Sequence, residues 1–203
     1  MNLHICNLTE KHLPMVDAFS CVENPEHLKQ YNSKERRRFL KHSKEMESFL
    51  KFEAYEEQEK GLNTTHLFID KENEKIAAYI SLCNDSIRLD FSERDSMGYS
   101  YTTIPALKIA RLAVASSYQH CGIGKLLIHF SAYIGMQIRK RSGIAFLTLD
   151  CYAHRVSFYE SIGFVRNMLQ PITLPYDTPI SMRLVLKDYL AQIGDENEAQ
   201  RQR

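Results

Sequence analysis

The sequence lacks the features that mark several specialised classes of protein. Its 26 basic residues nearly balance its 25 acidic residues, and the net charge of +1 demands neither a nucleic acid nor an anionic membrane as partner. The N-terminus has no apolar signal core, and no uninterrupted apolar run is long enough to span a bilayer. We therefore expect a cytoplasmic protein without membrane contact.

Cysteine is present, but its spacing excludes the usual cysteine-based frameworks. No two cysteines form a CxxC pair, and an odd, dispersed set is typical of reduced core thiols rather than of disulfides or a zinc site. We therefore predict that the protein has no metal site. The five cysteines are Cys6, Cys21, Cys83, Cys121 and Cys151.

Internal repeats and low-complexity linkers are also missing. A chain of 203 residues is long enough for one domain with a sizeable core. We expect that domain to occupy residues 1–187. A polar C-terminal tail, residues 188–203, is expected to be a frayed helix or disordered.

The most informative stretch of the chain is residues 104–125. An apolar run at residues 109–115 predicts a strand, a turn follows, and an amphipathic segment then predicts a helix. Gly122 and Gly124 stand between strand and helix. Glycines let a backbone approach a ligand closely, and free N–H groups at a helix start attract anions, so this layout favours phosphate binding.

Two common phosphate-binding fingerprints are absent from this stretch. The dinucleotide fingerprint needs a third glycine, but Leu127 stands at that position, and the P-loop spacing fails as well. The pattern that fits is Gln-x-x-Gly-x-Gly, formed by Gln119, Gly122 and Gly124. It resembles the pyrophosphate loop of the GNAT family of N-acetyltransferases, in which the loop follows the fourth strand and opens the third helix.

The remaining segments predict alternating strands and short helices. Residues 2–8 predict a first strand, and Thr9 stands where it can cap a short helix. Residues 85–103 predict a loop that borders a pocket, with Tyr99 and Tyr101 as candidate lining residues. Further strands are expected at residues 64–69 and 76–82, which form an antiparallel hairpin, and at 145–151 and 180–186, with a short helix at 154–162.

Residues 24–60 predict a helical, highly charged segment. Ser33 stands where it can cap a long helix, and Gly61 is expected to end the region. Interspersed glutamates favour a solvated helix face over a contact with RNA or an acidic substrate. The most basic cluster of the sequence lies in this helix, at Lys34, Arg36, Arg37, Arg38 and Lys41.

A second motif makes the resemblance specific. Residues 157–164 contain Phe158-Tyr159-Glu160 and end in Gly163-Phe164, similar to the Phe-Tyr-Glu-x-x-Gly-Phe signature of the GNAT family. Both motifs occur in the order and separation of that family, and the resemblance covers residues 64–186. One departure is that residues 151–155 lack the asparagine that many members carry shortly before the Phe-Tyr pair.

The resemblance implies an α/β (α+β) fold with a mixed, bent sheet of about six to seven strands flanked by helices. Residues 24–60 would be a helical insertion on the acceptor side. The sheet is expected to part between its fourth and fifth strands, where unpaired backbone groups would receive acetyl-CoA. The implied cofactor-binding residues are Leu112, Ala113, Val114, Gln119, His120, Cys121, Gly122, Ile123, Gly124 and Lys125.

The implied chemistry is direct transfer of an acetyl group to a primary amine, with CoA as product. The resemblance assigns Tyr159 as the catalytic acid that protonates the departing thiolate, and packing against the cofactor is its alternative role. A phenol with an ordinary pKa of about 10 is protonated at neutral pH. A backbone N–H of Ala113 or Val114 is implied to stabilise the oxyanion.

The general base is left open by the sequence. Residues 109–115 lack the glutamate that many family members carry on or near the fourth strand. A chain of water molecules that needs no side-chain base is one alternative. The side-chain candidates are Asp90, Glu93, Asp95, Asp150 and His154.

The acceptor is left open as well. The main hypothesis is a small-molecule or peptide amine, acetylated by a monomer or homodimer. Residues 49–57 and 104–114 look similar to toxin acetyltransferases that act on aminoacyl-tRNA, although the net charge of +1 argues against a nucleic-acid partner. A non-catalytic acetyl-CoA-binding module is the third hypothesis.

Overall fold

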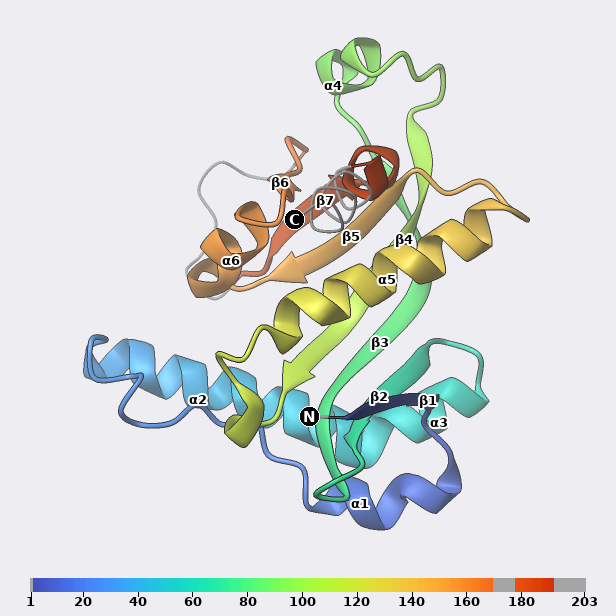
Figure 1. Cartoon of the computed structure of the whole chain (residues 1–203). Coiled ribbons are helices and arrows are strands. Elements are labelled where there is room, and N and C mark those ends of the chain that lie inside the picture. The colour runs from blue at the N-terminus through green and yellow to red at the C-terminus, as the bar shows by residue number, and fades with distance from the viewer. Residues whose placement is uncertain (1, 170–177, 192–203) are drawn as a thin grey trace, which may run out of the picture. The chain divides into compact units, whose positions relative to one another are not determined.

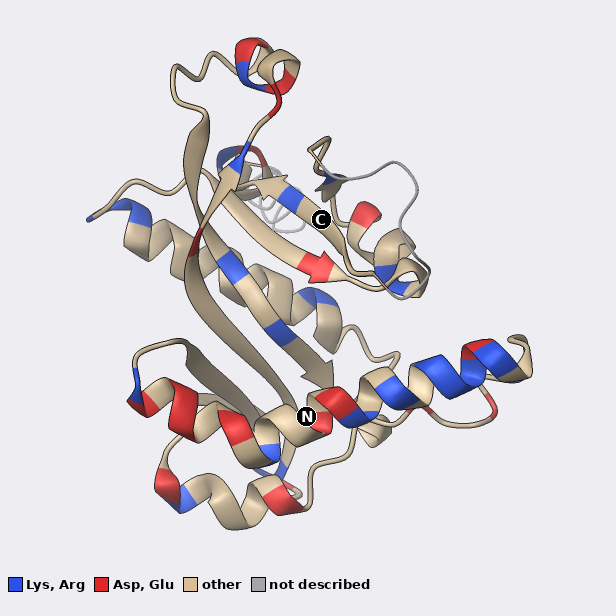
Figure 2. Cartoon of the chain, turned by 180° about the vertical axis from the view of Figure 1, so that it is seen from behind, with Lys and Arg blue, Asp and Glu red and all other residues tan. Residues whose placement is uncertain are grey.

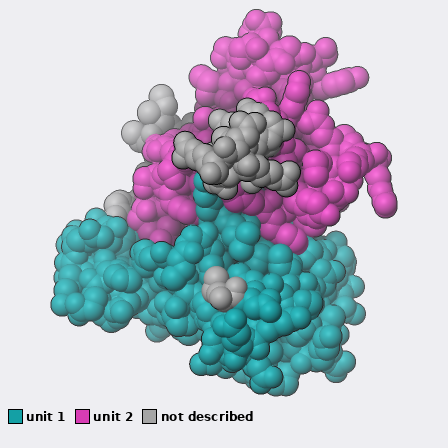
Figure 3. All heavy atoms as spheres, in the orientation of Figure 1, with its two compact units in different colours: residues 1–83, 110–128 teal, residues 84–109, 129–203 magenta. Residues whose placement is uncertain are grey.

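A computed structural model describes residues 2–169 and 178–191 of the chain. Its strands form one mixed seven-stranded sheet in the order β1-β2-β3-β4-β5-β7-β6 (Figure 1). The chain divides into two compact units, residues 1–83 with 110–128 and residues 84–109 with 129–203 (Figure 3). We call these the first and the second unit. The predicted mixed sheet of six to seven strands is confirmed.

Antiparallel pairing organises the strands of the first unit. β1 (Leu3–Asn7) pairs with β2 (Thr64–Asp70), and β2 pairs with β3 (Lys75–Arg88). The predicted hairpin therefore forms, with a third strand on its outer side. β4 (Thr103–Val114) starts six residues before the predicted strand, and its last five residues belong to this unit. The buried core includes Leu8, Val16, Phe49, Leu50, Leu67 and Tyr79.

Helices make up most of the predicted insertion. The segment contains α2 (Ser33–Ser48), a π-helical turn η2 (Phe49–Glu53) and α3 (Ala54–Glu59). Gly61 ends it with a φ of +72°, as expected for a helix stop. The predicted cap was wrong by one residue, because the Asn32 side chain accepts hydrogen bonds from the backbone N–H groups of Lys34 and Glu35. Before this segment lie η1 (Glu10–His12), which Thr9 precedes, and α1 (Leu13–Asp17).

The π-turn disturbs the regular hydrogen bonding at the end of α2. The Ala54 N–H bonds to the Phe49 carbonyl, five residues earlier, as a π-turn requires. The buried Tyr79 hydroxyl donates to the Met46 carbonyl at 2.7 Å. Tyr79 therefore links β3 to the end of α2 and satisfies a polar group near the irregular turn.

Replacing Tyr79 with phenylalanine is expected to lower the free energy of unfolding by about 1–3 kcal/mol, because the Met46 carbonyl loses its hydroxyl donor inside the core. Urea unfolding followed by circular dichroism measures this change. Tyr101→Phe is the matched control, because Tyr101 is 79% exposed. Equal stability of the two variants would contradict the assigned role of the buried hydroxyl.

A parallel strand pair lies in the second unit. Residues Ala106–Ile109 of β4 pair in parallel with Phe146–Leu149 of β5 (Phe146–Cys151). The predicted strand–helix–strand crossover is therefore present, with α5 (Ile123–Arg139) as its helix. Among the described residues this register ends at Ile109 and Leu149, while both strands continue. The parting of these two strands stays a prediction.

The C-terminal part of the second unit follows the predicted order. β5 pairs antiparallel with β7 (Ile180–Val185), and β7 pairs with the short β6 (Val165–Arg166). Between β5 and β6 lie η4 (Ala153–Arg155) and α6 (Val156–Glu160), where one short helix was predicted. Residues 186–191 are helical, and Tyr189 is buried against the His129 ring. The tail therefore begins with ordered packing, and residues 192–203 lie outside the described residues.

The predicted loop at residues 85–103 was partly wrong. β3 continues to Arg88, and α4 (Phe91–Ser96) follows, capped by the Asp90 side chain. Gly98 has a φ of +69° after this helix. The segment does border a cavity, lined by residues from Asp85 to Thr102, but Tyr99 packs edge-on against Phe146 and neither Tyr99 nor Tyr101 is among its lining residues. In the described part of the chain, no helix combines the length and apolarity needed to cross a membrane.

Candidate active site

The predicted pyrophosphate loop lies in the first unit, between β4 and α5. η3 (Ser116–Tyr118) fills the turn, and the Ser116 hydroxyl donates to the Val22 carbonyl at 2.6 Å. The Gln119 amide donates to the carbonyls of Cys21 (2.9 Å) and Val114 (3.1 Å). The side chain of the motif glutamine therefore stabilises the loop by hydrogen bonds to the protein backbone. Its assignment to cofactor binding stays a prediction.

Two residues of the loop adopt left-handed backbone conformations. His120 has a φ of +61° and Gly122 a φ of +80°, which a glycine adopts without strain. No atom lies within 4 Å of the position that a Cβ on Gly122 would occupy. The backbone is therefore open on this side, just before α5 begins at Ile123. An open left-handed glycine before a helix start is a cradle that suits a pyrophosphate group.

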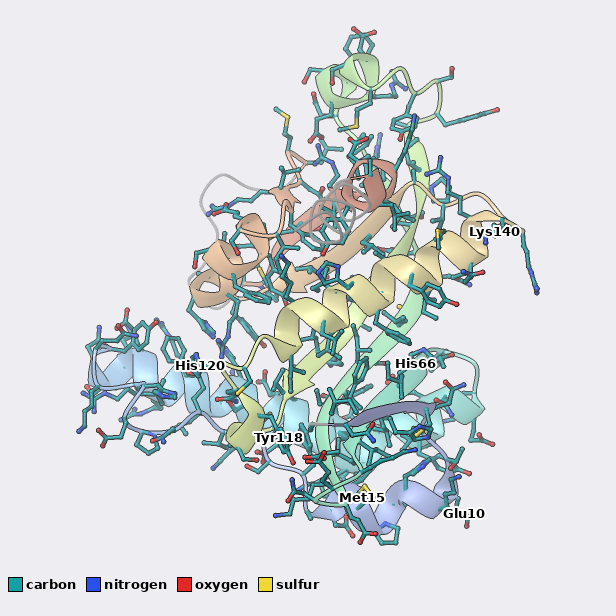
Figure 4. All side chains as sticks on the ribbon, viewed as in Figure 1. Glu10, Met15, His66, Tyr118, His120 and Lys140 are labelled. Carbon is teal, nitrogen blue, oxygen red and sulfur yellow. The ribbon has the colours of Figure 1, made fainter. Side chains whose placement is uncertain are left out.

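The side chains of the loop leave its backbone accessible. The Cys121 thiol is exposed and donates to the Gln119 carbonyl at 3.4 Å. The His120 ring, labelled in Figure 4, packs edge-on against the His27 ring, with 4.3 Å between ring centroids. Lys125 is exposed in the first turn of α5, where its charge can approach a phosphate. The predicted phosphate contact of His120 stays a prediction.

Tyr159 lies in the second unit, on α6. Its ring packs edge-on against Phe158 and Phe164, at centroid distances of 5.0 and 5.6 Å. Burial, and secondarily the neighbouring Cys151 thiol, raises the pKa of the Tyr159 phenol above its ordinary value. The described residues offer its hydroxyl no hydrogen-bond partner. The aromatic neighbours thus fix the ring and leave a protonated hydroxyl that can donate.

The candidate bases differ in how far the structure already engages them. Asp150 accepts a hydrogen bond from the Lys108 ammonium at 2.7 Å. Glu93 forms a buried ion pair with Arg183 at 2.5 Å, and Asp90 caps α4. A carboxylate that is already engaged by a cation or a helix end would have to give up those contacts to accept a proton from the acceptor. These contacts favour a water chain over Asp90, Glu93 or Asp150.

The second unit brings together two charged residues and one hydroxyl that the sequence analysis did not single out, namely Asp85, Lys108 and Thr148. The Thr148 hydroxyl donates to the Asp85 carboxylate at 2.6 Å, and Lys108 lies opposite Thr148 in the β4–β5 register. One feature of the sequence could have indicated this polar group, because Lys108 and Asp150 stand inside strands that are otherwise mostly apolar. Such polar positions on a sheet face call for partners or a ligand.

All five cysteines are free thiols, as the spacing predicts. Burial raises the pKa of the Cys151 thiol to about 12, which keeps it protonated and unreactive. Within residues 2–169 and 178–191, no group of three or more His, Cys, Asp or Glu residues could hold a metal ion.

Reducing agent is therefore expected to leave the urea midpoint of the protein unchanged, and purified protein should contain no stoichiometric zinc. Unfolding with and without dithiothreitol tests the first expectation, and elemental analysis by mass spectrometry tests the second. A midpoint that falls on reduction, or one zinc per chain, would overturn this interpretation.

Comparisons with known proteins support the sequence resemblance. Residues 63–166 match the family model described as "Acetyltransferase (GNAT) domain". Similar solved structures include one described as a bacterial toxin (18% identity, TM-score 0.72), which covers 95% of this chain and 96% of that chain. AtaT complexed with acetyl-methionyl-tRNA has 16% identity and a TM-score of 0.71, covering 95% and 99%. AtaTR bound with AcCoA has 18% identity and a TM-score of 0.64, covering 95% and 98%. These likenesses establish the fold.

Proposed function

Because the chain belongs to the GNAT acetyltransferase family, we propose that it transfers an acetyl group from acetyl-CoA to a primary amine. The observation that carries this proposal is the loop before α5, where Gly122 combines a φ of +80° with open space at its Cβ position. The AcCoA bound to the similar AtaTR structure supports the same cofactor here. We place the enzyme in the cytoplasm, as a monomer or homodimer.

Each predicted residue has a defined task in this reaction. Acetyl-CoA supplies a thioester whose acetyl group is ready for transfer. The backbone N–H groups of residues 120–124 hold its pyrophosphate, and Lys125 offsets part of the phosphate charge. The backbone of Leu112–Val114 binds the pantetheine arm and the oxyanion. Tyr159 gives its hydroxyl proton to the departing sulfur, while water accepts the proton of the amine.

The test is an acetyl-CoA consumption screen with purified protein. The acceptors are polyamines, amino acids, aminoglycosides, peptides and charged tRNA, and released CoA is measured with a thiol reagent. We expect CoA release above the hydrolysis background with at least one acceptor. Acetyl-CoA binding without turnover of any acceptor would instead favour the non-catalytic binding module.

Aminoacyl-tRNA is a second candidate acceptor, and the basic part of α2 favours it. Lysine and arginine positions gather along one end of this helix, whereas acidic positions gather toward its other end and α3 (Figure 2). This local basic patch is not visible in the balanced net charge. The similar AtaT structure holds acetyl-methionyl-tRNA, which supports the same class of acceptor. Binding of charged tRNA should weaken steeply with added salt, whereas a small amine should be much less sensitive.

A further inference from the structure

One sheet face of the second unit carries several charged and polar side chains beside apolar ones. In the strand registers, Lys108 of β4 lies opposite Thr148 of β5, and Thr148 lies opposite Arg183 of β7. Asp85 joins this row through its hydrogen bond with Thr148. Charged positions follow one another across the strands in the view from behind (Figure 2). We call this row the polar face.

The opposite side of the same strands is apolar. A Cβ on Gly135 of α5 would lie 3.0 Å from the Leu186 side chain and 3.7 Å from that of Leu147. The helix therefore packs closely against this side. The polar face has an apolar part as well, where Phe146 and Val185 belong to a buried cluster, so core packing leaves only its charged side chains to be explained.

A cavity of about 730 Å³ lies beside the polar face. This volume falls within the range of small-molecule sites, roughly 300–1,000 Å³. Its walls come from the end of β3, the start of α4, β4 and the segment around β6 and β7. The lining residues that the argument uses are Asp85, Arg88, Asp90, Arg94 and Lys108.

Some of the charged groups at this cavity are already engaged within the protein. Lys108 pairs with Asp150, and the Asp90 carboxylate accepts hydrogen bonds from the backbone and hydroxyl of Ser92. The ion pair of Glu93 with Arg183, both at most 6% exposed, joins α4 to β7. These contacts hold the walls of the cavity in place and leave a smaller set of charges for a ligand.

Besides Asp90, which caps α4, three lining charges have no oppositely charged partner among the described residues. Asp85 accepts hydrogen bonds from Thr148 and from the Ser86 backbone, both uncharged donors. Arg94 lies over the Phe91 ring at 5.3 Å, and Arg88 is exposed. Apart from the helix-capping Asp90, the described residues of the cavity therefore offer one unpaired carboxylate and two unpaired guanidinium groups.

We propose that this cavity binds the acceptor amine and selects amines that also carry a carboxylate or phosphate group. The ammonium form of the acceptor pairs with Asp85, and its anionic group pairs with Arg88 and Arg94. This inference rests on the proposed function, because it assigns a binding site to the acceptor of that reaction. It excludes simple polyamines as preferred acceptors, since a second cation would face the two arginines.

The test is a calorimetric titration of three probes against the intact protein with CoA present. β-Alanine carries an amine and a carboxylate, O-phosphoethanolamine an amine and a phosphate, and ethanolamine the amine alone. We expect one of the two anionic probes to bind at least tenfold more tightly than ethanolamine. The stronger of the two identifies carboxylate or phosphate as the preferred anion. Equal binding of all three, or binding of none, overturns the inference.

Substitutions locate the site within the cavity. Asp85→Asn and Arg94→Gln remove one charge each and should weaken the preferred probe by about tenfold to a hundredfold. Lys187→Gln, at an exposed cation outside the cavity lining, should leave binding unchanged. Unaltered affinity in both cavity variants, with melting temperatures at the wild-type value, overturns the assignment. A variant that does not fold is replaced by Arg88→Gln, whose side chain is exposed.

A separate titration with CoA distinguishes a failure of the proposed acetyltransferase function from a failure of the proposed acceptor site. A wild-type protein that fails to bind CoA contradicts the proposed function itself. A protein that binds CoA but shows no preference for the anionic probes contradicts only the acceptor site.

Discussion

Replacing Tyr159 with phenylalanine is expected to slow acetyl transfer roughly 10²–10⁴-fold, the usual contribution of a general acid. The substitution removes one hydroxyl and keeps the ring that packs against Phe158 and Phe164. The acetyl-CoA dissociation constant should stay close to the wild-type value, because the lost proton donor acts chiefly in the transition state. Single-turnover rates and a binding titration on the same variant measure both quantities.

The pH dependence gives an independent check on Tyr159. Burial raises the pKa of its phenol, so the proton that must be donated stays bound through about pH 9. The wild-type rate should therefore not fall between pH 7 and 9 through loss of this acid. Tyr133→Phe is the matched control, since Tyr133 is 52% exposed on α5. If Tyr159→Phe turned over like this control, with chemistry rate-limiting, Tyr159 would be a packing residue.

Replacing Gly122 with glutamate is expected to abolish the rise in melting temperature that acetyl-CoA produces. A ligand that binds only the folded protein stabilises it by mass action, so loss of binding removes the shift. The new side chain would fill the open space beside the loop and bring a negative charge to the phosphate position. Differential scanning fluorimetry over a series of acetyl-CoA concentrations measures the effect.

A control variant is needed to distinguish loss of acetyl-CoA binding from the loss of stability that a side chain at a positive φ causes by itself. Gly98 also has a positive φ, +69°, and its Cβ position is open as well. Gly98→Glu therefore imposes a comparable backbone cost on the second unit without touching the loop. It should lower the melting temperature of the unliganded protein and keep the acetyl-CoA shift. A retained shift in Gly122→Glu would exclude this loop as the cofactor site.

Periodic segments with clear ends were predictable from the sequence. The hairpin of β2 and β3 has β-forming residues on both sides of a polar turn, and it forms as expected. The parallel pairing of β4 with β5 follows from an apolar strand, an amphipathic helix and a second apolar strand. The first family motif, residues 119–124, connects β4 to the helix of this crossover, so the resemblance and the fold agree.

Elements that depend on single side chains were harder to predict. Asn32 and Ser33 are both good helix caps, and only the backbone geometry shows that Asn32 accepts the hydrogen bonds. α4 escaped prediction because its six residues, Phe91–Ser96, are too few to show an apolar period. Its position depends on a long-range ion pair of Glu93 with Arg183. No local pattern reports such a contact.

In the candidate site too, features with a local sequence pattern were predictable, whereas contacts between distant residues were not. The glycine spacing predicts a loop whose backbone a ligand can approach closely, and the structure leaves the Cβ position of Gly122 open. The bracing role of Gln119 requires the Cys21 carbonyl, 98 residues away in the chain, and no spacing rule contains it. Asp85 was overlooked for a related reason, because its partner Thr148 comes from a distant strand.

The division of the chain bears on how this gene can recombine. The boundaries between the two units fall after residues 83, 109 and 128, so each unit is encoded by two separate stretches of the gene. After a single crossover with a related gene, at least one unit would therefore always contain sequence from both parent genes. Exchange of a whole unit needs several junctions at once, two of which interrupt β3 and β4. Chimeras made by one-point shuffling should accordingly lose folding more often than those whose breakpoints follow all three boundaries.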